Sequence, residues 1–234
     1  MLKTLRIAGR DRKRLEEIFS VTSRYGLGVL LARIGLDRSG SDDAVAGVSH
    51  SLPRRTRLAM EELGPTFVKL GQILATRADL LSPEWVAEFE QLHSKAPTLP
   101  FEELRPIVEE ALGEAPESAF SEFDTEPLAA ASIAQVHRAT LHDGRAVVIK
   151  IRRPGIRLRV EADIRLLAHI AALAERGSAE ARRFGPSRMM RQLADAMIEE
   201  LDFTNEARNA DRLRTDFADQ PSVVVPEIHW EWTS

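Results

Sequence analysis

Residues 143–152 read Asp-Gly-Arg-Ala-Val-Val-Ile-Lys-Ile-Arg, and they carry the clearest secondary-structure signal in the chain. Asp143-Gly144 favours a two-residue turn between two apolar segments. The β-branched residues after the turn predict a strand, so we expect an antiparallel β-hairpin. Side chains alternate between the faces of a strand, which places Val148 and Lys150 together on one face. The opposite face then carries Val147, Ile149 and Ile151.

Lys150 interrupts an apolar strand, where an unpaired charge is costly to bury. One interpretation is a lysine that faces water from an edge strand. The other is a phosphate-binding lysine, since kinases place one on a Val/Ala-x-Ile-Lys strand and pair it with a glutamate of the next helix. Kinases precede this strand with a glycine-rich loop, whereas residues 129–132 are Ala-Ala-Ala-Ser. Alanine resists positive φ, so we expect a stiffer loop.

Helical periodicity surrounds the hairpin on both sides. Before it, apolar spacing predicts helices over about residues 11–36 and 52–80, with Pro65 opening a new helix. Further helix starts are predicted at Ser82-Pro83-Glu84, with Ser82 as the cap, and at Leu99-Pro100. After the hairpin we expect one helix over about 161–174, a second over about 186–216, and one or two strands over 223–230. Gly113 is a predicted helix end, and residues 37–50 are a predicted loop or linker.

The composition excludes several classes of function. The chain has 234 residues, 44% of them hydrophobic and 29% charged, which suits one or two soluble domains. A net charge of −4 offers no basic field for nucleic acid. The lack of cysteine excludes disulfides, thiol catalysis and cysteine-based metal sites. No segment approaches the roughly 18 apolar residues that span a bilayer.

The N-terminus is basic and leaves two interpretations open. Its cations can form a solvated helix face, or an amphipathic segment that touches anionic lipid. These cations are Lys3, Arg6, Arg10, Arg12, Lys13 and Arg14.

Four short motifs follow one another along the chain. They are Lys69-Leu70-Gly71-Gln72, the alanine-rich residues 129–132, Lys150, and Glu200-Leu201-Asp202. In this order they resemble the K-x-G-Q motif, alanine-rich loop, nucleotide lysine and E-x-D motif of the UbiB (AarF/ABC-one) family of atypical protein-kinase-like proteins. The resemblance covers about residue 50 to the end.

The resemblance implies an α+β fold, in which a helical extension precedes a protein-kinase-like N-lobe with a small antiparallel sheet. We expect an N-terminal helix and linker over residues 1–50, the helical extension over 51–115, and the N-lobe over 116–234. The C-lobe is expected to be absent, with the chain ending near the lobe hinge.

For the complete protein, the resemblance implies binding of ATP and Mg²⁺ and a role in ubiquinone (coenzyme Q) biosynthesis. It also implies a cytoplasmic location, peripheral at the inner membrane, with anionic lipid or other quinone-biosynthesis proteins as partners. The catalytic loop and the metal-binding Asp-Phe-Gly have no counterpart in this chain, so we expect the chain alone to be inactive. The alternative is a non-catalytic helical scaffold or membrane-surface module.

Roles for individual residues follow from the same resemblance. The catalytic residues would be Lys150, Glu206, Lys69, Glu200 and Asp202. The nucleotide contacts would be Ala129, Ala130, Ala131, Ser132, Ile133, Gln135 and Lys150. Lys69, Gly71 and Gln72 would be regulatory, with Lys69 occluding the peptide site.

Two ion pairs are expected among these residues, Lys150 with Glu206 and Lys69 with Glu200. On a regular helix Glu200 and Asp202 diverge by about 200°, so they cannot face one lysine without a bend. Without the other motifs, these acids would be an ordinary solvated helix face.

Overall fold

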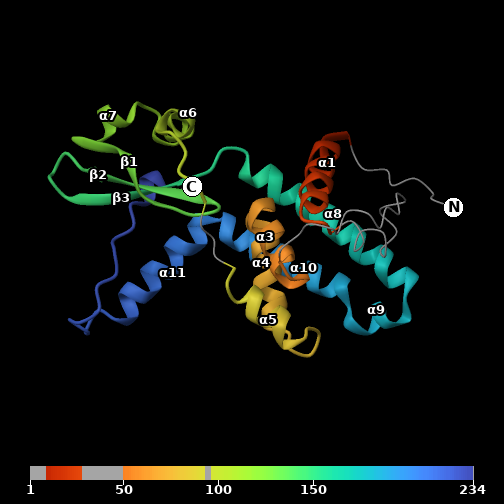
Figure 1. The fold of residues 1–234 in the computed structure, drawn as a ribbon. Coiled ribbons are helices and arrows are strands. Elements are labelled where there is room, and N and C mark those ends of the chain that lie inside the picture. Colours follow the sequence, from red (N-terminus) through yellow and green to blue (C-terminus); the bar gives the residue numbers. More distant parts are fainter. Residues whose placement is uncertain (1–8, 28–49, 93–95, 234) are drawn as a thin grey trace. The chain divides into compact units, whose positions relative to one another are not determined.

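The computed structural model describes residues 9–27, 50–92 and 96–233, and Figure 1 shows helices together with one small sheet. This confirms the expected α+β class. The chain forms two compact units, which are described separately: Met1–Ser94 with Arg157–Asp195, and Lys95–Ile156 with Ala196–Ser234. The expected division near residues 50 and 115 stays a prediction.

The first unit is helical. Its elements are α1 (Gly9–Arg24), α3 (Leu52–Leu63), α4 (Pro65–Ala75), α5 (Pro83–Phe89), most of α8 (Ile156–Gly177), α9 (Ala179–Phe184) and the first part of α10 (Pro186–Leu201). The predicted break at Pro65 is confirmed, because Gly64 separates α3 from α4 with a φ of 102° that favours glycine. Ser82 precedes α5 as predicted, but its side chain accepts no capping hydrogen bond, so that part of the prediction is wrong.

The core of this unit lies where α1, α3, α4 and α8 meet. Its buried members are Ile18, Val21, Leu27, Ala59, Leu63, Phe67 and Leu166. A second cluster joins α4 to α5 through Val68, Phe89 and Leu92.

A buried ion pair ties α1 to α8. Nε of Arg14 donates to Oδ1 of Asp163 at 2.6 Å, and the side chains are only 6% and 0% exposed. The same guanidinium donates to the carbonyl of Leu63 at 2.6 Å. Arg14 is therefore a structural cation, and its inclusion among the lipid-facing N-terminal charges was wrong.

The second unit is built around the sheet. It contains α6 (Phe101–Leu112), α7 (Pro116–Ala119), β1 (Glu122–Ala130), β2 (Ala134–Thr140), β3 (Ala146–Arg152), α11 (Phe203–Asp216) and a 3₁₀ turn (Trp230–Trp232). The strands run antiparallel in the order β1-β2-β3. The predicted hairpin is β2–β3, in which Thr140 pairs with Ala146 and Val136 with Lys150.

The faces of the sheet differ, as the alternation of β3 predicts. Ile151 lies in a buried cluster with Phe101, Leu104 and Val108 of α6. Figure 1 shows α6 and α7 along one side of the sheet and α11 on the other. Val148, on the same face as Lys150, is 59% exposed.

Several elements of secondary structure differ from the sequence predictions. β1 was missed because Pro127 and its polar neighbours hide the alternation, and its pairing with β2 is irregular. The helix expected over 186–216 is broken at Asp202, and the short helix α9 was missed. No strand forms over 223–230 in the described structure, where Val224 is 89% exposed.

The N-terminal helix was predicted to run to about residue 36, whereas α1 ends at Arg24. Residues 28–49, which include most of the predicted loop, lie outside the described residues. None of the described helices is long and apolar enough to cross a bilayer.

Candidate functional site

The candidate site lies on the open face of β3, in the second unit. Because Ile151 packs in the α6 core and side chains alternate along a strand, Lys150 lies on the opposite face of β3, where it is 36% exposed. Its ammonium forms an ion pair with the carboxylate of Glu206, in the first turn of α11. The structure therefore brings together the strand lysine and the helix glutamate that the sequence pattern suggested.

Asp202 creates the bend that positions α11. Its backbone is extended, with φ −96° and ψ 93°, and its Oδ1 accepts hydrogen bonds from the Thr204 amide at 3.0 Å and the Thr204 hydroxyl at 2.5 Å. Asp202 is thus the N-cap of α11. The hydrogen bond from Thr204 is the main cause that lowers the pKa of Asp202. This carboxylate, predicted to be catalytic, is engaged in starting the helix that carries Glu206.

Phe203 links the start of α11 to β3. Nζ of Lys150 lies 4.6 Å from the centre of the Phe203 ring, and the guanidinium carbon of Arg152 lies 5.1 Å from it. Cations at these distances are attracted to the ring. No sequence motif pointed to Phe203 or Arg152, although the alternation of β3 places Arg152 on the face of Lys150.

The alanine-rich segment forms the tight turn between β1 and β2. Ala129 and Ala130 belong to β1, and Ala131 N donates to Ala134 O at 2.8 Å, closing the turn around Ser132 and Ile133. The stiffness of the turn stays a prediction, and two hydrogen bonds from Arg153 hold the turn. Its Nε donates to Ala131 O at 2.8 Å, and its amide donates to Ile133 O at 2.9 Å.

Arg153 also fixes the segment that leads into α6, because its Nη2 donates to Pro97 O at 2.6 Å. Burial lowers the pKa of this guanidinium. Arg153 is therefore a clamp that joins the alanine turn to residue 97. No sequence motif predicted this role.

Gln135 is buried rather than open to a ligand. Its Oε1 accepts from Leu99 N at 2.8 Å, and its Nε2 donates to Leu99 O at 3.0 Å and to His137 Nε2 at 3.2 Å. His137 Nε2 must then accept, so Nδ1 carries the proton and donates to Asp124 O at 2.9 Å. The side chain is fully buried and both amide hydrogens are donated within the chain, so contact of Gln135 with a cofactor stays a prediction that this placement does not favour.

The Lys69-Leu70-Gly71-Gln72 motif lies on α4, in the first unit. A Cβ added to Gly71 would lie 2.2 Å from Leu92 Cδ1 and 3.0 Å from Met60 Sδ, so a larger residue does not fit without movement. Gln72 Nε2 donates to Leu92 O at 3.2 Å. Gly71 and Gln72 thus hold the chain after α5 against α4. Lys69 and Glu200 belong to different units, and their pairing stays a prediction.

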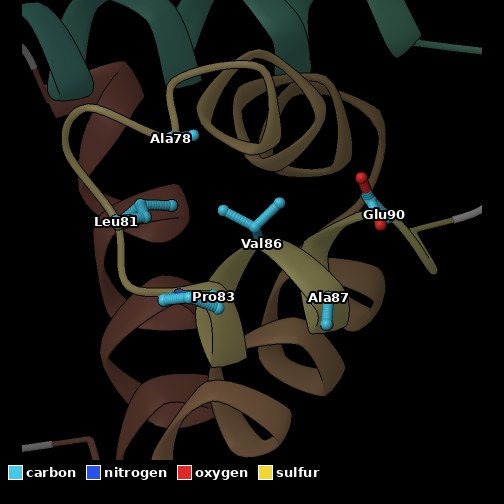
Figure 2. A pocket seen from close by; sticks show the side chains of 6 residues that line it. All are labelled: Ala78, Leu81, Pro83, Val86, Ala87 and Glu90. Atoms are coloured by element: carbon cyan, nitrogen blue, oxygen red, sulfur yellow. The ribbon is translucent and has the colours of Figure 1, made fainter.

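A shallow cavity of about 300 Å³ lies beside α5 in the first unit. Figure 2 shows Val86 pointing into it. Its lining consists of Ala78, Leu81, Pro83, Val86, Ala87 and Glu90.

Comparison with known proteins assigns the chain to a family. Residues 91–234 match the model of the ABC1 atypical kinase-like domain. The chain belongs to the ABC1 atypical kinase-like family. Among curated members, it is 42% identical over 179 residues to a probable protein kinase UbiB of Marinobacter nauticus, covering 76% of this chain and 33% of that protein. It is 43% identical over 187 residues to one of Xylella fastidiosa, covering 80% and 34%.

The chain therefore spans about a third of the length of the curated ABC1-family relatives that it matches. The solved Rv3197–erythromycin complex from Mycobacterium tuberculosis is similar at 22% identity and a TM-score of 0.49, over 91% of this chain and 47% of that one. In this ABC1-family chain, β3 and α11 carry the two partners of the ion pair between Lys150 and Glu206.

Proposed function

We propose that this chain carries the nucleotide-binding N-lobe of an atypical kinase or ATPase, in which Lys150 contacts the phosphates of ATP. The observation that supports this most is the ion pair of Lys150 with Glu206. In kinases this pairing fixes the lysine where it meets nucleotide phosphates. Lys150 is held in the same manner and remains partly open to solvent.

The alanine turn would cover the nucleotide phosphates in this proposal. Arg153 holds the carbonyl of Ala131, so the turn is a fixed rather than an adaptable cover. Among glycine and alanine, only glycine takes positive φ freely, and a turn of alanines therefore limits how its amides can approach a phosphate. We expect this feature to favour weak nucleotide binding.

Mg²⁺ would accompany ATP and neutralise part of the phosphate charge. Within residues 9–27, 50–92 and 96–233, no group of three or more His, Cys, Asp or Glu side chains is arranged to hold a metal ion. We assign none of the described side chains as a Mg²⁺ ligand.

The family resemblance and the relatives described as probable protein kinase UbiB support a place in ubiquinone biosynthesis for the complete protein. The chain has no counterpart of the catalytic-loop aspartate and asparagine or of Asp-Phe-Gly that phosphoryl transfer by kinases requires. We therefore expect it to bind ATP and to transfer no phosphoryl group by itself.

Thermal unfolding with and without ATP tests this proposal, since a ligand that binds only the folded state raises Tm with its concentration. We expect millimolar ATP with Mg²⁺ to raise the Tm of the chain and to leave the Tm of Lys150→Ala unchanged. An equal rise in both proteins, or none in either, would contradict the proposal. Release of phosphate that depends on Lys150 would contradict the expected lack of turnover.

A further inference from the structure

Arg152 is a second cation on the open face of β3. It follows Lys150 by two residues, so the two side chains leave the strand on the same face, about 7 Å apart along it. Lys150 is neutralised by Glu206. Arg152, in contrast, makes no ion pair with any residue of the described chain, and its Nε is buried without a hydrogen-bond acceptor.

The ring of Phe203 brings the two cations together. Both lie over this ring, at 4.6 Å for Lys150 Nζ and 5.1 Å for the Arg152 guanidinium carbon. Two neighbouring cations repel each other, and the single carboxylate of Glu206 balances only one of them. The group formed by Lys150, Arg152 and Glu206 therefore keeps one positive charge that no described residue of the second unit pairs.

The next arginine shows what a structural guanidinium looks like in this unit. The guanidinium of Arg153 donates hydrogen bonds to the carbonyls of Ala131 and Pro97, and so joins two segments of the chain. Arg152 donates no hydrogen bond to any described residue, and its guanidinium contacts the ring of Phe203. A planar guanidinium with free donors suits the oxygens of a phosphate, to which its hydrogen bonds are charge-assisted.

We infer that Arg152 is a second phosphate ligand, which acts beside Lys150 on an oligophosphate and so favours nucleoside di- and triphosphates over monophosphates. This inference rests on the proposed nucleotide site, and it adds a residue that none of the four motifs contains. Phe203 would act as a positioning residue, because it contacts both cations.

Calorimetric titration of the 234-residue chain with ATP, AMP and inorganic triphosphate tests the inference. We expect Arg152→Gln to weaken binding of ATP and triphosphate about tenfold, the loss of one hydrogen-bonded charge, and to change AMP binding by less than about twofold. Arg152→Lys keeps the charge without the planar donors and should give a smaller loss. Arg212→Gln, an exposed arginine on α11, removes the same charge elsewhere and should bind all three ligands as wild type does.

The outcomes separate this inference from the function on which it rests. If Arg152→Gln binds ATP as tightly as wild type, the inference is overturned and the nucleotide site stands. If wild type binds triphosphate through Arg152 but does not bind ATP, the nucleotide function is overturned and the anion site stands. If wild type binds neither, both are overturned. Should Arg152→Gln fail to fold, Arg152→Lys decides, since undiminished ATP affinity in that variant would overturn the inference.

Discussion

Arg14 on α1 and Asp163 on α8 form a buried ion pair between residues that lie 149 positions apart in the chain. Two hydrogen bonds join them, at 2.6 and 2.9 Å. Burial raises the pKa of the Asp163 carboxyl, and the guanidinium of Arg14 opposes that shift. The N-terminal helix is thus an integral part of the first unit.

Removing Arg14 leaves the Asp163 charge buried without its partner, which is the costly way to break such a pair. We expect Arg14→Ala to lower the free energy of unfolding by roughly 3–5 kcal/mol in urea titrations. Arg12→Ala is the matched control, because Arg12 pairs with Glu16 on the exposed side of the same helix. Arg12→Ala should lower the free energy of unfolding by about 1 kcal/mol or less. Similar losses in the two variants would contradict this description of α1.

Gly71 is required by packing. Since a Cβ there would lie 2.2 Å from Leu92 Cδ1, we expect Gly71→Ala to destabilise the chain by about 1–3 kcal/mol, as overpacking does. The two residues should also be coupled, so that Leu92→Ala costs less in the Gly71→Ala background than in wild type. A double-mutant cycle in urea measures this coupling. Additive effects would show that Gly71 does not contact Leu92 as described.

Gln135 holds Leu99 through both polar groups of its amide. Gln135→Leu removes these partners from buried groups, and we expect a loss of about 2–4 kcal/mol in the free energy of unfolding. Gln192, exposed on α10, gives the control Gln192→Leu, which should change stability little. A Gln135→Leu protein of wild-type stability but weaker ATP binding would instead support the cofactor role that the sequence suggested.

Asp202 makes the capping of α11 dependent on pH. The hydrogen bond from Thr204 lowers its pKa in the folded protein, so its stabilising contribution is complete above the ordinary pKa of aspartate, about 3.9. The contribution is lost as the pH falls through the lowered native value. We expect Asp202→Ala to unfold at lower urea concentration than wild type at pH 7, and the difference to shrink below pH 4. A difference that does not change between pH 7 and pH 3 would contradict the role of the ionised cap.

Local signals in the sequence predicted much of the fold. The β2–β3 hairpin follows from Asp143-Gly144 and the alternation of its strand, and the break between α3 and α4 follows from Gly64-Pro65. α6 ends as predicted at Gly113, which has a φ of 77°. These features depend on neighbouring residues alone.

Features that depend on distant partners could not be predicted in this way. From the sequence alone, Arg14 is predicted to be a surface charge, because its partner Asp163 is distant in the chain. In the same way, Gln135 is predicted to contact a ligand, because its hydrogen-bond partner Leu99 is not its sequence neighbour. The break at Asp202 was missed because helical periodicity continues through it, although Asp-x-Thr is a local capping signal. At the site, the pairing of Lys150 with Glu206 was predicted from the family resemblance, whereas the contacts of Phe203 with both cations required the structure.

The ATP dissociation constant of three proteins, measured by calorimetry, tests the central claim most directly. Wild type should bind ATP weakly, and Lys150→Met should bind at least about tenfold more weakly, because a charge-assisted bond to phosphate is lost. Glu206→Gln should show a smaller loss, since it keeps the lysine and removes only the partner that positions it. Failure of wild type to bind ATP, or equal affinity in wild type and Lys150→Met, would contradict the account.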